Sequence, residues 1–303
     1  MSKVKSYLSL IKFSHTIFAM PFALVGFFLA LFENTSVIPG WGHRIFPPQF
    51  PWKEVGLKFI LVIGCMVFAR SAAMAFNRYL DRQYDARNPR TAIREIPSGI
   101  ITPKNALLFT LVCCLLFIVC CYFINRPCFY LSPVALAVIL GYSYAKRFTP
   151  LCHLILGLGL SLAPIGAYLA VTGVFSQLPI LFSLAVLFWV SGFDIIYALQ
   201  DEEFDKSQQL YSIPAWLGKA KALRVSEMLH LMSAAAIVYA GVYGNFGWLY
   251  WAGSAVFAGM LLYQHSIVKP YDLKKVNLAF MTANGIASVV FAIFVIADML
   301  INF

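Results

Sequence analysis

Residues 105–125 read NALLFTLVCCLLFIVCCYFIN, an apolar run without a charged residue. A helix that crosses the hydrocarbon core of a bilayer needs about 20 consecutive apolar residues, so this run predicts one transmembrane helix. Outward from it, eight more apolar stretches alternate with short polar breaks. The sequence therefore predicts an all-α integral membrane bundle of nine transmembrane helices in a single domain, 1–303, with helices near 13–32, 56–80, 105–125, 129–145, 152–172, 178–200, 222–242, 246–266 and 277–300.

The composition agrees with a protein that is dissolved in lipid. Of the 303 residues, 61% are hydrophobic and 12% are charged, and the mean hydropathy is +0.78. An ordinary soluble domain has about 25% charged residues, so the class of soluble enzymes is excluded. The seven cysteines and five histidines have neither C-x-x-C nor zinc-ligand spacing. We therefore expect both residue types to be structural.

The net charge of +10 would suit a nucleic-acid partner, but its distribution indicates membrane topology instead. With the N-terminus placed inside, eighteen Lys and Arg residues fall in inside segments and four fall in outside breaks. This bias follows the positive-inside rule. We expect a multi-pass protein of the cytoplasmic membrane with a cytoplasmic N-terminus, and no nucleic-acid partner.

The second and sixth apolar stretches each end in an acidic motif on the side predicted to be cytoplasmic. In the first motif, Asp81 and Asp85 share a helix face with Asn77, because the three are spaced by four residues. In the second, Asp194, Asp201 and Asp205 share a face through steps of seven and four. The motifs are separated by 120 positions, which predicts two four-helix repeats followed by a ninth helix.

Two carboxylate faces around a shared space predict a Mg²⁺ site. Mg²⁺ prefers a few carboxylates together with phosphate oxygens, so we expect the carboxylates of the two faces to bind Mg²⁺ that arrives with a diphosphate. Arginines near the first motif would bind the phosphate oxygens and stabilise charge on the leaving group. The strongest candidates are Arg82, Arg90 and Arg94.

The charged residues also fit a solvated surface or a transporter. A loop rich in mixed charge can simply face water, and paired acids within a membrane can bind the coupling ion of a transporter. Transport sites usually lie near the bilayer midplane, whereas these acids lie at one margin beside arginines. The pattern therefore favours an enzyme over a cation-coupled transporter.

Three strings in the sequence resemble the signatures of one family. They are NRYLDRQYDARNPRT at 77–91, DIIYALQDEEFD at 194–205 and YSYAKRFT at 142–149. The first two resemble the paired motifs of the UbiA superfamily of intramembrane prenyltransferases, and the resemblance covers essentially the whole chain. Asn-Pro-Arg-Thr and the string REIPSG at 94–99 are similar to the 4-hydroxybenzoate polyprenyltransferase branch.

The resemblance implies a Mg²⁺-dependent transfer of a polyprenyl group from polyprenyl diphosphate to an aromatic acid. The acceptor would be 4-hydroxybenzoate, in quinone biosynthesis, with a naphthoate-type menaquinone precursor as the alternative. It also implies that Asn77, Asp81, Asp85, Asp201 and Asp205 hold Mg²⁺ and the diphosphate. Arg147, Tyr197 and Asp194 would lie at the acceptor. One departure is Tyr211, which stands where many members have a basic residue.

Overall fold

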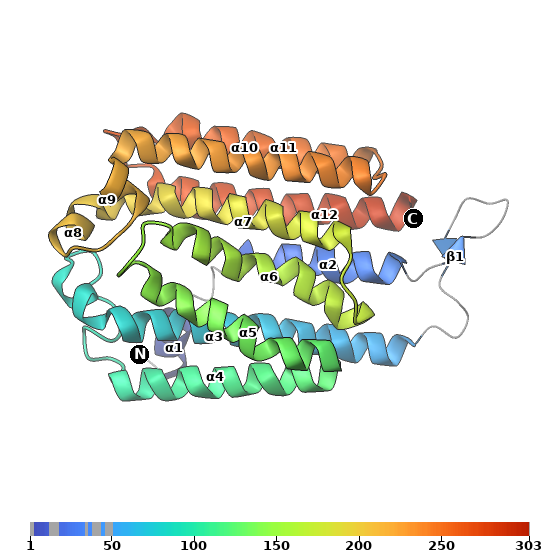
Figure 1. Cartoon of the computed structure of the whole chain (residues 1–303), viewed down its shortest axis with the longest axis horizontal. Helices are drawn as coiled ribbons and strands as arrows, with labels where there is room; N and C mark the ends of the chain where they lie inside the picture. The colour runs from blue at the N-terminus through green and yellow to red at the C-terminus, as the bar shows by residue number, and fades with distance from the viewer. Residues whose placement is uncertain (1–2, 12–17, 34–35, 38–43, 46–50, 303) are drawn as a thin grey trace.

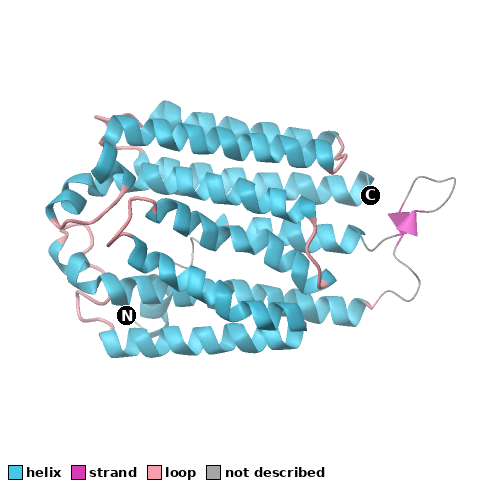
Figure 2. Cartoon of the chain, viewed as in Figure 1, coloured by secondary structure: helices cyan, strands magenta, loops and turns pink. Residues whose placement is uncertain are grey.

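Long helices that run back and forth along one axis make up most of the molecule (Figures 1 and 2). The structure is a computed structural model that describes residues 3–11, 18–33, 36–37, 44–45 and 51–302. The helices are α1 (Lys3–Leu10), α2 (Met20–Glu33), α3 (Trp52–Arg87), α4 (Pro103–Ile124), α5 (Arg126–Ala145), α6 (Cys152–Thr172), α7 (Gln177–Ala198), α8 (Glu202–Ser207), α9 (Ile213–Leu217), α10 (Lys219–Tyr243), α11 (Trp248–Ile267) and α12 (Asn284–Asn302).

Short irregular turns and one small strand pair complete the described elements. A 3₁₀ turn, Leu199–Asp201, joins α7 to α8, and a π-helical turn, Leu278–Ala283, precedes α12. Strands β1 (Ser36–Val37) and β2 (Arg44–Ile45) pair antiparallel between α2 and α3. The prediction of an all-α bundle is therefore confirmed for the described residues, apart from this pair of two-residue strands.

Each of the nine predicted stretches overlaps a helix, but not all of these helices meet the requirements for a membrane span. Seven are long and apolar enough to cross a bilayer, within the described residues, and this makes the chain an integral membrane protein. Helix α2 has 14 residues and is too short by this criterion, and α11, which overlaps the stretch 246–266, is not among the seven either. Part of the first predicted stretch, 13–17, lies outside the described residues. The count of nine spans and the two four-helix repeats stay predictions.

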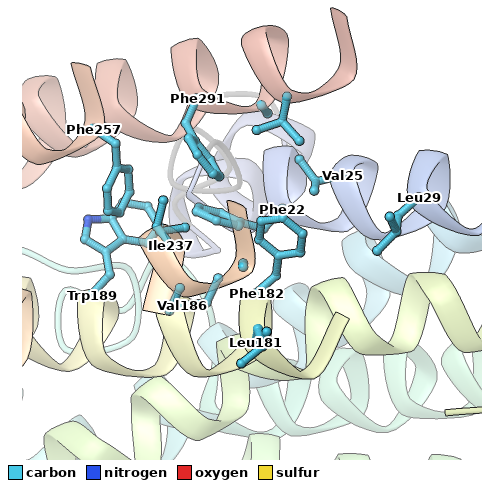
Figure 3. Close-up of a cluster of buried hydrophobic side chains, with 14 of the residues drawn as sticks. Phe22, Val25, Leu29, Leu181, Phe182, Val186, Trp189, Ile237, Phe257 and Phe291 are labelled. Carbon is cyan, nitrogen blue, oxygen red and sulfur yellow. The ribbon is translucent and has the colours of Figure 1, made fainter. Parts of the chain in front are cut away.

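Helices pack closely where small residues meet a neighbouring backbone. A Cβ added to Gly26 on α2 would lie 2.0 Å from the carbonyl oxygen of Pro164 on α6, so only glycine allows this approach. Small residues serve the same purpose in many membrane bundles. Beside this contact, aromatic side chains from α2, α7, α11 and α12 fill the interior (Figure 3), among them Phe22, Trp189, Phe257 and Phe291.

The two helices with acidic motifs are longer than a membrane crossing requires. The 36 residues of α3 span roughly 54 Å, against about 30 Å for the hydrocarbon core of a bilayer. Helix α3 ends only where Asn88 becomes extended before Pro89. Helix α7 likewise continues through its 3₁₀ turn into α8. Both acidic motifs therefore lie at the same end of the bundle, which Figure 1 marks by α8 and α9 and which we call the α8 end.

Candidate active site

A cavity of about 610 Å³ opens at the α8 end, between α3, α5, α6 and α7. It brings together side chains that lie far apart in the sequence. Of the eleven residues predicted for the site, all except Arg82 line it. These lining residues are Asn77, Asp81, Asp85, Arg90, Arg94, Arg147, Asp194, Tyr197, Asp201 and Asp205.

The first motif is held in place by cations and by its own asparagine. Asn77 donates from Nδ2 to Asp81 Oδ2 over 3.1 Å, one helical turn apart. Asp85 is buried, and its Oδ1 lies 2.6 Å from Arg94 Nη1. The second oxygen of Asp85, Oδ2, is 3.9 Å from Arg78 Nη1 and has no hydrogen-bond partner among the described residues. One buried oxygen of the motif is thus free to bind a ligand.

The segment after α3 connects the first motif to the second. Arg90 binds Asp201 with two nitrogens, Nε to Oδ1 over 3.2 Å and Nη2 to Oδ2 over 2.5 Å. Its third nitrogen, Nη1, donates to the hydroxyl of Tyr197 over 2.8 Å, and Asn88 Nδ2 donates to Asp201 over 3.3 Å. A planar guanidinium is suited to such forked contacts. This segment therefore fixes the distance between α3 and α7 at the cavity.

Residues after α5 complete the polar walls of the cavity. Lys146 Nζ lies 2.7 Å from Oδ1 of Asp205, whose side chain is fully buried. Ser212 donates to the other oxygen of Asp205 over 2.9 Å and caps α9. Arg147 Nη2 lies 3.3 Å from Asp81 Oδ1. Each of the four motif carboxylates thus has a cationic neighbour from another segment.

Two of these cations, Lys146 and Arg90, are held in the charged form by their carboxylate partners. Burial disfavours the charged form of Lys146, but the adjacent carboxylate of Asp205 outweighs it and raises the pKa of Lys146 above its ordinary value. Burial also opposes the charge on Arg90, and the Asp201 carboxylate again raises the pKa. Both side chains are therefore cationic at neutral pH.

An uncommon arginine lies deeper in the same cavity. Arg70 is on α3 seven residues before Asn77, which places it roughly 10 Å further into the bundle. No described carboxylate pairs with it, and its Nε is buried without a hydrogen-bond partner in the described part of the chain. A charge within a membrane helix is costly and usually functional. Arg70 is therefore available to an anionic ligand group.

A second cavity, an apolar groove, lies next to the first. It measures about 380 Å³ and is lined by α3, α4, α5 and α6. Arg70, Met74, Tyr142, Leu156 and Leu160 line both cavities, so the polar space and the groove are adjacent. We call this second cavity the apolar groove, and its shape suits a hydrocarbon chain attached to a polar head.

The donor set of the polar cavity fits a divalent metal that arrives with phosphate. Among the described residues, no three His, Cys, Asp or Glu side chains converge as ligands on one point. The cavity lining contains six Lys or Arg and six Asp or Glu residues, so it has no excess positive charge for a polyanion. Mg²⁺ shared between carboxylates and phosphate oxygens would supply that charge. The unpartnered Asp85 Oδ2 is one oxygen that can bind it.

The chain is similar to known proteins of one family. Residues 19–286 match the model of the UbiA prenyltransferase family. The chain belongs to this family. Its curated relatives include two proteins named 4-hydroxybenzoate octaprenyltransferase. That of Tolumonas auensis is 30% identical over 243 residues, which cover 78% of this chain and 82% of the relative. That of Nitrosospira multiformis is 29% identical, covering 83% and 86%.

Solved structures of UbiA homologues have the same fold. The apo structure of a homologue from Aeropyrum pernix K1 superposes with a TM-score of 0.75 at 29% identity, covering 95% of this chain and 98% of that one. A homologue from Archaeoglobus fulgidus bound to GPP and Mg²⁺ has a TM-score of 0.72 at 20% identity, covering 98% and 100%. The prediction of a UbiA prenyltransferase is thus confirmed.

Two residues singled out from the sequence, Arg82 and Tyr211, do not line the polar cavity. Arg82 lies outside the lining, where its guanidinium contacts the carbonyl and the ring of Tyr79. Arg78 lines the cavity instead, and its spacing of seven from Asp85 could have indicated a shared face. Tyr211 is 49% exposed, and its backbone N–H donates to the carbonyl of Lys146. Lys146, which sequence reasoning left without a role, supplies the cation at Asp205.

Proposed function

We propose that this prenyltransferase moves a polyprenyl group from a polyprenyl diphosphate to 4-hydroxybenzoate. The observation that carries the proposal is that the polar cavity and the apolar groove lie side by side and share five lining residues. A polyprenyl diphosphate has the same division, because an anionic head is joined to a long hydrocarbon chain. The acceptor is proposed from the names of the curated relatives.

The head of the donor is proposed to bind between the two motifs. Asp81, Asp85, Asp201 and Asp205 would hold Mg²⁺, which neutralises the diphosphate and makes it a better leaving group. Arg90, Arg94, Arg147 and Lys146 would donate to phosphate oxygens, and Asn77 would donate beside them. These donors are fixed in advance by their carboxylate partners. Such fixed donors need little reorganisation when charge develops on the leaving group.

Transfer is proposed to be an electrophilic aromatic substitution. The bond between the allylic carbon and the diphosphate oxygen breaks, and its electron pair leaves with the diphosphate. The allylic carbocation then forms a carbon–carbon bond with an electron-rich ring carbon of the acceptor, which subsequently loses a proton. The aromatic faces of Phe193, Tyr197 and Phe280, which line the cavity, stabilise the cation and exclude water from it.

The carboxylate of the acceptor is proposed to bind Arg70. Arg147, the residue expected from the resemblance, already contacts Asp81 and donates to the carbonyl of Leu80. Arg70 has no carboxylate partner among the described residues and lies at the junction of the two cavities. An acceptor held there has its ring beside the start of the prenyl chain. Tyr197 and Asp194 would flank it, as the sequence predicts.

The membrane orientation is proposed from the distribution of charge. We place the α8 end at the cytoplasmic surface of the cytoplasmic membrane, because the Lys and Arg excess lies there. In Figure 1, α1 lies at this end and α12 finishes at the opposite one, which suits an odd number of crossings. A water-soluble acceptor then enters from the cytoplasm and the donor from the lipid.

A reconstituted assay tests the reaction. Purified protein in lipid nanodiscs is given octaprenyl diphosphate, Mg²⁺ and either 4-hydroxybenzoate or 1,4-dihydroxy-2-naphthoate, and prenylated products are identified by mass spectrometry. We expect a prenylated 4-hydroxybenzoate that requires Mg²⁺ and disappears in Asp201→Asn. Glu203→Gln is the matched control, because Glu203 is an exposed acid outside the cavity lining.

Each remaining result has a definite meaning. Product from the naphthoate alone would overturn the acceptor and leave the reaction type intact. No product from any acceptor would overturn the proposed reaction. No structural observation favours the transporter considered from the sequence, and the family of the chain is one of prenyltransferases.

A further inference from the structure

A buried histidine holds one of the cavity carboxylates in a fixed orientation. His153, at the start of α6, is 3% exposed, and its Nδ1 lies 2.7 Å from Oδ2 of Asp194 on α7. Its other ring nitrogen, Nε2, is 3.4 Å from the backbone nitrogen of Ile213, the first residue of α9. The imidazole therefore bridges two elements that are distant in the sequence.

These contacts determine which ring nitrogen carries the hydrogen. A backbone N–H can only donate, so Nε2 must accept from Ile213 and has no hydrogen of its own. The hydrogen is then on Nδ1, from which it is donated to Asp194 Oδ2. The imidazole thus occupies one oxygen of Asp194 and fixes the orientation of its side chain.

The second oxygen of Asp194 is available to a ligand in the polar cavity. No described residue makes a hydrogen bond to Oδ1, the side chain is 24% exposed, and it lines the polar cavity. Asp194 lies seven residues before Asp201 on the same face, roughly 10 Å deeper in the bundle. It is therefore deeper in the bundle than the motif carboxylates, and it lines the same cavity as Arg70, where the acceptor ring is proposed to bind.

We propose that Asp194 is the general base of the transfer and that His153 is its positioning residue. This inference rests on the proposed function. After the new carbon–carbon bond forms, the ring carbon still carries its hydrogen. Asp194 Oδ1 takes that proton, the electrons of the carbon–hydrogen bond restore the aromatic ring, and the proton then passes to water at the open end of the cavity. Asp194 would therefore do more than bind the acceptor.

The test uses an acceptor that carries deuterium at the two ring positions beside the hydroxyl. In the wild-type enzyme we expect ionisation of the donor to limit the rate, so that the deuterated acceptor reacts as fast as the ordinary one. In Asp194→Asn we expect kcat to fall by about 10²- to 10⁴-fold and the deuterated acceptor to react more slowly than the ordinary one. The isotope effect is the decisive readout, because a residue that only binds the acceptor would not create one.

Two substitutions at His153 test the positioning role separately. His153→Asn keeps an N–H donor near the place of Nδ1, whereas His153→Leu has none. We expect the isotope effect to be large in His153→Leu and smaller in His153→Asn, with more activity retained in the latter. Binding of the prenyl diphosphate, measured without acceptor, should be the same in both and in the wild type. If Asp194→Asn fails to fold, the comparison of His153→Asn with His153→Leu tests whether Asp194 is the general base.

Three outcomes would count against the inference. A loss of activity in Asp194→Asn with a raised acceptor KM and no isotope effect would make Asp194 a binding residue only. Unchanged activity in that variant would exclude it from the reaction. A wild-type enzyme that prenylates no acceptor would instead refute the proposed function on which the inference rests.

Discussion

Lys146 and Arg147 are consecutive in the chain, and their side chains bind carboxylates of opposite motifs. Lys146 Nζ lies 2.7 Å from Asp205 Oδ1, and Arg147 Nη2 lies 3.3 Å from Asp81 Oδ1. The turn after α5 therefore joins the two acidic helices, as the segment after α3 does through Arg90 and Asp201. Because Asp205 is fully buried, its pairing affects stability as well as substrate binding.

Removing the cation at Asp205 should destabilise the protein. In Lys146→Met the buried carboxylate loses its charged partner, and breaking a buried pair in this way costs about 3–5 kcal/mol. We expect a clear fall in the temperature of thermal unfolding in detergent, and weaker binding of the diphosphate. Lys206→Met is the control, since Lys206 is exposed and its partner, Glu202, keeps a second cation, Lys219, at 3.9 Å. An equal fall in both variants would contradict the prediction.

The same pair predicts how stability depends on pH. The pKa of Lys146 is raised from 10.5 in the folded protein by the carboxylate of Asp205, against the effect of burial. A raised pKa contributes stability that is complete below the unfolded pKa and is lost as the pH rises through the folded one. The stability difference between wild type and Lys146→Met should therefore be constant from about pH 6 to 9 and shrink only in strongly alkaline solution. A difference that vanishes near neutrality would show that Lys146 is not the charged partner.

Arg70 should determine the affinity for the acceptor. Arg70→Gln removes the only cation proposed to meet the acceptor carboxylate, so we expect acceptor KM to rise while the affinity for the prenyl diphosphate stays constant. A neutral analogue, 4-hydroxybenzamide, should be used equally well by the wild type and the variant. The comparison is Arg147→Gln, which should weaken diphosphate binding instead because Arg147 contacts Asp81. The opposite pattern would return the acceptor to Arg147.

Arg78 and Arg82 provide a matched pair for the diphosphate site. Arg78 is buried in the lining near Asp85, and Arg82 lies outside it against Tyr79. We expect Arg78→Gln to lower kcat/KM for the donor strongly, and Arg82→Gln to change it little. Comparable losses in the two variants would restore the role predicted for Arg82 from the sequence.

The apolar groove should be sensitive to filling at Gly166. This residue lines the groove on α6, roughly 15 Å along the helix from Leu156, and a Cβ there meets no atom within 4 Å. Gly166→Leu should therefore reduce transfer from octaprenyl diphosphate more than from geranyl diphosphate, whose short chain ends before this point. Gly141→Leu is the control, because Gly141 has similar free space and lies outside the groove. Equal effects on both donors would show that the chain binds elsewhere.

Local patterns were sufficient to predict the helices and the motif carboxylates. Hydrophobic runs indicate helices directly because lipid leaves the backbone no partner outside the helix. The spacing of Asp81 and Asp85, and of Asp201 and Asp205, puts each pair on one face. Partners between segments were harder to predict. Nothing in the string around Lys146 shows that this lysine turns to Asp205 while Arg147 turns to Asp81.

The sequence by itself determined that the chain is a helical membrane protein with two acidic motifs, because these properties depend on residues a few positions apart. Only the tertiary structure decided that Arg78 rather than Arg82 enters the cavity, that Arg70 is left without a carboxylate among the described residues, and that His153 orients Asp194. Those outcomes depend on how α3, α6 and α7 are rotated and packed against one another. Helix rotation is set by side-chain packing across the whole bundle, and no local spacing records it.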